Sequence, residues 1–175
     1  HNLGSIKTLC KSGVLLDNGR LRYHGTVLKT VEKYLDSMDE SSNLKSFEIE
    51  KSKMAYITNI KIDDLEGNSL KVIPVYKPYR ITVSVTLNTS IKDFILGIGF
   101  CTMENVSLRT IWSNPVSLKK GNYQFIISEE NIYYTGKYQI NVGLSMLNGK
   151  ESIQYISNAI IIEFEDYVDK KLAFD

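Results

Sequence analysis

The sequence predicts a mainly β protein built around an antiparallel, immunoglobulin-like (jelly-roll-like) sandwich of two sheets. Three observations support this fold class. Beyond about residue 46 the apolar residues recur with a period of two, turn signals follow about every 8–14 residues, and no intervening segment has a convincing helical pattern. Strands that alternate apolar and polar residues keep one solvated face, as antiparallel sheets do, whereas buried parallel strands are apolar throughout.

Residues 1–37 have a different, mixed pattern. Asn2 can cap a short helix that starts at Leu3, and Asp17-Asn18-Gly19 is a strong turn signal between two short strands. Thr26 can cap a second helix whose apolar residues recur at helical spacing. A hairpin between two helices is too small to bury its own apolar faces. We therefore expect this segment to be the end of a larger domain.

Residues 38–46 are polar and are predicted to be a linker, followed by the sandwich over residues 47–175. The predicted strands are 55–62, 69–75, 80–88, 93–103, 108–113, 123–128, 137–146, 152–156 and 159–165. Residues 63–68 contain three acidic side chains, but position twelve of a calcium loop would be Pro74 instead of a bidentate glutamate. The segment is better explained as a hairpin turn with Gly67 at positive φ.

Composition excludes several classes of function. The chain has 175 residues, 21 Lys and Arg against 20 Asp and Glu, and no basic stripe, which argues against a nucleic-acid partner. Two cysteines make no disulfide framework, and with two histidines they give no metal-ligand spacing, so we expect no metal or cofactor and a reducing, cytosolic setting. No serine, histidine and acid group as a triad, and no carboxylate pair of the glycosidase kind can be named.

Residues 1–37 resemble the C-terminal end of an ABC-transporter ATPase domain. The resemblance rests on the hairpin Val14-Leu15-Leu16-Asp17-Asn18-Gly19-Arg20-Leu21 and on the helix that follows it, and it puts His1 at the position of the nucleotide switch histidine. A phosphate loop, a magnesium-binding acid and a signature motif are missing from the sequence. We therefore expect a chain that begins just inside an ATPase domain and does not hydrolyse ATP, whereas the full-length parent would.

A polar linker followed by a sandwich of this size resembles the Wzt-like ATP-binding subunits of polysaccharide ABC exporters. The segments that carry the resemblance are 60–67, 94–100, 135–140 and 158–164. It implies non-catalytic recognition of the exported, O-antigen-like and lipid-linked glycan. It also implies a transmembrane subunit as partner and a peripheral location on the cytoplasmic side of the inner membrane. The alternative is a dimerisation or docking module that touches no sugar.

The last predicted strand, 159–165, is apolar on both faces. Such a strand at a chain end must lie between sheets or pair with another chain, and ABC ATPases work in pairs. We therefore expect a homodimer in which this strand is a candidate for exchange between protomers.

Sugar binding needs an aromatic ring for the apolar face of a pyranose, neutral polar groups for its hydroxyls, and a shallow groove. Gly97 and Gly99 point outward from strand 93–103 and leave the backbone open to close approach, unless they only mark a bulge. The outward residues of strand 137–146 form a neutral stripe of Gln139, Asn141, Gly143 and Ser145. If the two strands are neighbours, these residues form the floor of a groove.

Four aromatic residues are candidates for ligand contact, each with a structural alternative. Trp112 can stack on a sugar or fill the sandwich core. Tyr133 and Tyr134 lie at a predicted corner, where a tyrosine can instead bond to backbone, and Tyr155 precedes a predicted turn at Ser157-Asn158. The polar stripe of strand 80–88 is better explained as an ordinary solvated sheet face.

Overall fold

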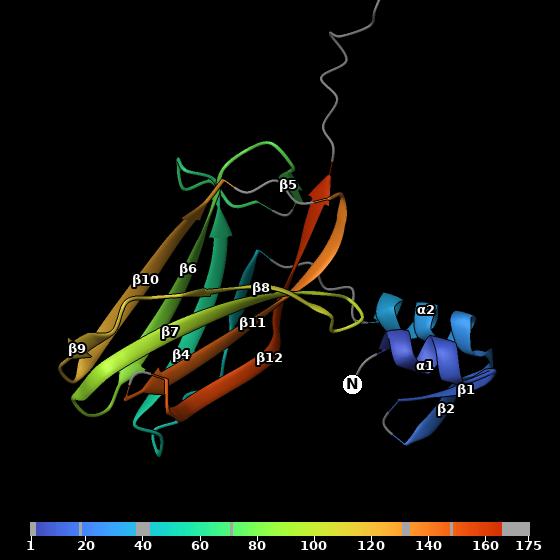
Figure 1. Ribbon diagram of the computed structural model, residues 1–175, viewed down its shortest axis with the longest axis horizontal. Helices are drawn as coiled ribbons and strands as arrows, with labels where there is room; N and C mark the ends of the chain where they lie inside the picture. The colour runs from blue at the N-terminus through green and yellow to red at the C-terminus, as the bar shows by residue number, and fades with distance from the viewer. Residues whose placement is uncertain are drawn as a thin grey trace, which may run out of the picture.

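The computed structural model describes residues 3–17, 19–37, 43–70, 72–130, 134–147 and 149–165 (Figure 1). A small α/β unit comprises α1 (Leu3–Leu9), β1 (Ser12–Asp17), β2 (Arg20–Thr26) and α2 (Val27–Ser37). All other strands form the sandwich. Within the described residues no helix is long and apolar enough to cross a membrane.

The α/β unit follows the sequence pattern. β1 and β2 pair antiparallel across the predicted turn, where Gly19 has φ 75°, and α2 starts directly after Thr26. Val27 and Val31 are buried, but several large apolar side chains of the unit remain exposed: Leu9, Val14, Leu16, Leu21 and Leu28. The unit thus does not bury its own apolar faces. The predicted cap Asn2 and the switch-histidine position His1 lie outside the described residues.

Two sheets form the sandwich and confirm the predicted fold class. The smaller sheet has the order β10-β6-β4-β3, from β3 (Leu44–Ser46), β4 (Ala55–Asp63), β6 (Tyr79–Leu87) and β10 (Gly121–Glu129). The larger sheet has the order β5-β12-β11-β7-β8, from β5 (Val72–Pro74), β7 (Ile91–Thr102), β8 (Ser107–Trp112), β11 (Gly136–Met146) and β12 (Glu151–Glu165). A short β9 (Val116–Leu118) also pairs with β7. The named pairs are antiparallel except β12 with β5.

The core lies between the two sheets and follows the alternation of the sequence. On β6 the buried side chains are Tyr79, Ile81, Val83, Val85 and Leu87, none more than 1% exposed. From the larger sheet the core receives Phe94, Leu96, Ile98, Phe100, Ile140, Val142 and Leu144. Every second residue of these strands therefore points to the outer face, where a binding site can be built without changing the core.

The last two predicted strands belong to one continuous strand of the structure. Residues 152–156 and 159–165 form the continuous β12, and Ser157-Asn158 is a bulge in it, not a turn. Asn158 takes φ 51°, and its backbone N–H donates to Oδ1 of Asn141 at 2.7 Å. This side-chain acceptor replaces the missing ladder bond, so the strand continues through the irregularity.

Other boundaries also differ. Residues 44–46, which were assigned to the linker, form β3 against β4, and β9 was not predicted. Both are strands of three residues, too short for an alternating pattern. The turn at 63–68 has the predicted form: Gly67 has φ 92°, and Oδ1 of Asp64 accepts bonds from the N–H groups of Glu66 and Asn68.

The segment of β12 that is apolar on both faces is buried within a single chain. β12 pairs with β11 along most of its length, and β5 pairs only with its last three residues, Glu163–Glu165. Ile160, Ile161 and Ile162 are successive residues and all are at most 6% exposed. The burial of both faces therefore needs no second chain.

Gln154 joins the two sheets where β4 is irregular. Its side chain is buried, accepts a bond from the N–H of Ile57 at 2.8 Å and donates to Glu50 at 2.7 Å. Ile57 lies at a register shift of β4. Gln154 thus supplies the acceptor that this buried backbone donor needs.

Replacing Gln154 by alanine should lower the free energy of unfolding by about 1–3 kcal/mol, because the N–H of Ile57 is left buried without an acceptor. The exposed Gln124 on β10 provides a matched control, whose replacement by alanine should change stability by no more than about 0.5 kcal/mol. Urea unfolding followed by far-UV circular dichroism measures both. Equal midpoints for the two variants would contradict the assigned role.

Candidate functional site

An open groove of about 440 Å³ lies on the outer face of the larger sheet. Strands β7, β8, β11 and β12 provide most of its lining, and the turn between β7 and β8 closes one end. The lining residues are Gly97, Gly99, Cys101, Asn105, Ser107, Thr110, Trp112, Asn141, Gly143, Tyr155 and Ser157.

Strand pairing brings the predicted groove residues together. β7 and β11 are neighbours, with Gly97 opposite Gly143 and Gly99 opposite Asn141. An aromatic residue flanks each glycine of the Gly97–Gly143 pair, since Trp112 of β8 pairs with Gly97 and Tyr155 of β12 pairs with Gly143. One row across four strands thus contains two glycines between two aromatic residues.

The glycines of this row make room for the rings. A β-carbon on Gly97 would lie 2.6 Å from Cζ3 of Trp112, far inside van der Waals contact, and one on Gly143 would lie 3.4 Å from Cδ2 of Tyr155. Each ring therefore leans over the neighbouring glycine, on the outside of the sheet. Gly99 is different, because the nearest atom to its β-carbon position is 3.7 Å away. Gly99 is the open part of the floor.

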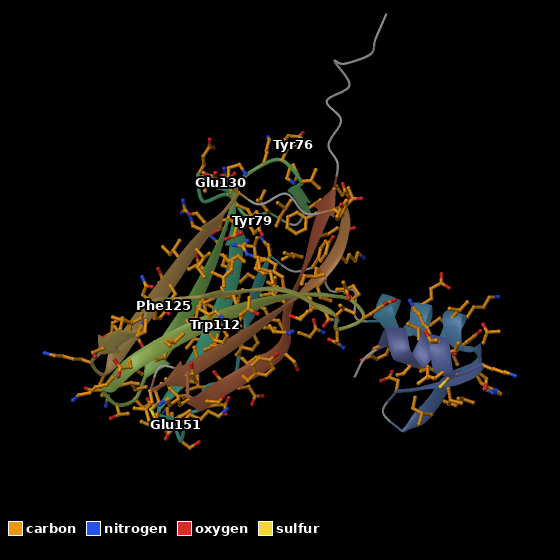
Figure 2. The ribbon with its side chains drawn as sticks, viewed as in Figure 1. Tyr76, Tyr79, Trp112, Phe125, Glu130 and Glu151 are labelled. Carbon is orange, nitrogen blue, oxygen red and sulfur yellow. The ribbon has the colours of Figure 1, made fainter. Side chains whose placement is uncertain are left out.

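Trp112 is not a core residue. Its side chain is 63% exposed and that of Tyr155 is 64% exposed. Large aromatic side chains on a sheet are seldom this accessible, and the two here occur in the same row. Figure 2 shows Trp112 on the sandwich, well away from Tyr76 at the β5 end.

The polar candidates differ in what they can offer a ligand. Asn141 lines the groove, but its amide already donates to Sγ of Cys101 at 3.2 Å and accepts from Asn158. Gln139 is only 2% exposed and donates to the carbonyl of Met103 at 3.1 Å. The hydroxyl of Ser145 faces the carbonyl of Ile95 at 3.5 Å. Neither Gln139 nor Ser145 is part of the groove lining.

Of the predicted corner tyrosines, Tyr134 is 91% exposed and does not line the groove. Tyr133 lies outside the described residues. A tyrosine does bond to backbone here, but it is Tyr138, whose hydroxyl donates to the carbonyl of Tyr134 at 2.8 Å. Burial raises the pKa of Tyr138, since the phenolate would be poorly solvated there.

Sequence reasoning missed several lining residues, notably Asn105, Ser107, Thr110 and Ser157. Thr110 could have been predicted, because it is two residues from Trp112 and therefore lies on the same face of the strand. Asn105 was not, since it occupies a turn at φ 63° that carries no periodic signal. Ser157 was assigned to a turn, and only the β12 bulge brings it to the groove.

The groove has no obvious reactive group. Burial raises the pKa of the Cys101 thiol, and the hydrogen bond from Asn141 offsets part of this rise. Among the described residues, no group of three or more histidine, cysteine or acidic side chains could hold a metal ion. What the groove offers is stacking surface and neutral hydrogen-bonding groups.

A second polar surface lies on the outer face of the smaller sheet. It includes Thr58, Ser84, Thr86, Asn122 and Gln124. Its aromatic residue, Tyr123, is half-buried, and the hydroxyl donates to the carbonyl of Lys119 at 2.9 Å. Thr86 also donates to Asn122 at 2.8 Å, so these groups partly satisfy one another. This face lacks an exposed ring comparable to Trp112.

The fold and the groove define an immunoglobulin-like sandwich module with an open groove on the outer face of one sheet. Solved structures share the fold. The crystal structure of the C-terminal domain of Wzt matches with a TM-score of 0.62 and 15% identity, over 71% of this chain and 78% of that one. A Niemann-Pick type C2 protein from the Japanese carpenter ant matches with a TM-score of 0.50 and 10% identity, over 70% of this chain and 98% of that one.

The family model of the Wzt C-terminal domain matches residues 48–173, and the chain belongs to that family. It thus contains the C-terminal domain of a Wzt-like subunit of an ABC exporter, and the family implies a transmembrane partner and a role in polysaccharide export. No curated protein matches the sequence.

Cys101 should remain a thiol at about pH 8 and react several-fold more slowly with iodoacetamide than the exposed Cys10, because the thiolate is the reactive form and burial disfavours it. A time course of alkylation, followed by peptide mass spectrometry, measures the two rates. Equal rates at the two positions would show that Cys101 is accessible and ionised.

Proposed function

We propose that the groove on the larger sheet binds the polysaccharide that the exporter transports, without catalysing a reaction. The observation that carries this proposal is the row Trp112–Gly97–Gly143–Tyr155, in which two glycines seat two exposed rings on the outside of the sheet.

The chemistry of the lining suits a sugar. A pyranose has an apolar C–H face that packs on an aromatic ring and a rim of hydroxyls that need neutral partners. The lining also contains the hydroxyls of Ser107, Thr110 and Ser157, each able both to donate and to accept. The groove is open along the sheet, which suits a polymer that extends beyond the site.

We expect the affinity of one site to be weak. An open groove buries little ligand surface, and sugar hydroxyls exchange hydrogen bonds with water for hydrogen bonds with protein. In the assembled exporter the domain would then recognise a lipid-linked glycan at the cytoplasmic side of the inner membrane as a peripheral part of the complex.

Trp112→Ala should lower the affinity for the exported polysaccharide at least about ten-fold, which corresponds to about 1.4 kcal/mol. The reason is that half of the stacking surface is lost while the core is untouched. Tyr76→Ala removes an aromatic side chain that is 51% exposed at a turn outside the groove, and it should bind as the parent does. Isothermal titration calorimetry with polysaccharide from the source organism measures both.

Two results would contradict sugar recognition at this site. One is a full titration without heat or chemical-shift change; the other is equal affinity of the parent and Trp112→Ala. Circular dichroism must show that the variant is folded.

The second candidate function is a dimerisation or docking module. It is favoured by the exposed apolar side chains of the α/β unit, such as Leu9, Leu16 and Leu21, which need a further surface to cover them. The doubly apolar segment of β12 does not itself call for an exchanged strand, because Ile160, Ile161 and Ile162 are buried within one chain. A homodimer remains a proposal.

Sedimentation velocity separates the two candidates. If recognition is the function, Trp112→Ala loses glycan binding and keeps the association state of the parent. If scaffolding is the function, a Leu16→Ser and Leu21→Ser variant changes the association state, and no groove variant affects export.

A further inference from the structure

We infer that the groove selects an uncharged stretch of saccharide, and that Gly97 is a positioning residue that holds Trp112 beside Tyr155 in one stacking platform. The inference rests on the proposed function and adds the class of ligand and the origin of its orientation.

Trp112 and Tyr155 form one platform because both rings lean toward the middle of the sheet. Trp112 and Tyr155 stand on strands β8 and β12, three strand spacings apart, or about 14 Å. Each ring, however, lies over the glycine on its inner side, and these two glycines are directly paired. The rings therefore lie over neighbouring strands and form an apolar surface near the middle of the sheet.

The seat of Trp112 depends strictly on the absence of a side chain at position 97. At 2.6 Å and 2.8 Å, two ring carbons of Trp112 lie where no β-carbon could tolerate them. Any other residue at position 97 must push the indole away from the sheet. Gly143 has a looser fit, with Cδ2 of Tyr155 at 3.4 Å, so an added methyl there needs only a small shift.

The lining carries no ionisable acid or base other than the Cys101 thiol and the Tyr155 phenol, since none of its eleven residues is Asp, Glu, Lys, Arg or His. Glu104, which precedes the lining residue Asn105, is paired with Lys7. Arg109, between two lining positions on β8, is paired with Glu129 of the opposite sheet at 2.6 Å. These nearby charges already have partners.

A charged sugar would meet no counter-ion in this groove. A carboxylate or phosphate that gives up water needs a cation or several strong donors in exchange, and otherwise the desolvation cost opposes binding. Neutral sugar hydroxyls face no such cost, because the hydroxyls of Ser107, Thr110 and Ser157 can replace water. The groove therefore favours uncharged residues of a polymer over uronic acids and phosphorylated sugars.

The test of charge selection is an array of purified bacterial surface polysaccharides, half of them uncharged and half containing uronic acid or phosphate, probed with the full chain and with Trp112→Ala. We expect the bound polymers to be uncharged, their binding to depend on Trp112, and their affinity to change less than about two-fold between 50 and 500 mM NaCl. Acidic polymers held through Trp112, with an affinity that falls as salt rises, would overturn the inference but leave the proposed function standing. Absence of binding to every polymer, or binding that survives Trp112→Ala, would overturn both.

The test of positioning is a double-mutant cycle on a polymer that binds. Gly97→Ala should weaken binding at least about five-fold and shift the fluorescence of Trp112, the only tryptophan. Gly121→Ala on β10, where the nearest atom would be 3.5 Å away, should do neither. In the Trp112→Ala background, Gly97→Ala should cost less than two-fold more, because Gly97 acts through the indole. Unchanged affinity of folded Gly97→Ala, or full additivity of the two changes, would overturn the positioning role.

Discussion

The antiparallel register between β7 and β11 is the constraint on which the rest of the site depends. It sets Gly97 opposite Gly143 and thereby brings Trp112 and Tyr155 into one row. A slip of one residue would turn every side chain of a strand to the other face. The large buried side chains that alternate with the glycines, such as Ile98, therefore fix the register of the site as well as the core.

The neutral groove and the paired charges around it have a common physical basis. A sheet can expose aromatic rings to solvent at little cost if polar residues surround them, whereas an isolated charge beside an apolar platform would compete with the ligand for water. Arg109 avoids this competition by pairing with Glu129 across the sandwich. The same ion pair joins the two sheets, so one contact both connects the sheets and neutralises a charge near the groove.

Much of this could be predicted from the sequence, because alternation reports which face a residue occupies. The sandwich, the outward glycines and the Asn141 strand followed from that signal. The exposure of Trp112 did not, since alternation does not say which of two faces is solvated on an edge strand. Asn105 and the bulge at Asn158 were also beyond reach, because both residues have φ above zero and the bulge also depends on Asn141, a side-chain acceptor distant in sequence. The roles of the groove residues stay predictions.

On β7 and β11 the residues that fill the core and the residues that line the groove lie on opposite faces of the same strands. The two sets alternate along the strand, and their side chains contact different surroundings. Homologous chains can therefore exchange groove residues such as Thr110 or Ser157 one at a time, at no loss of interior volume. The outer surface of this sheet can thus vary in its chemistry independently of the scaffold beneath it.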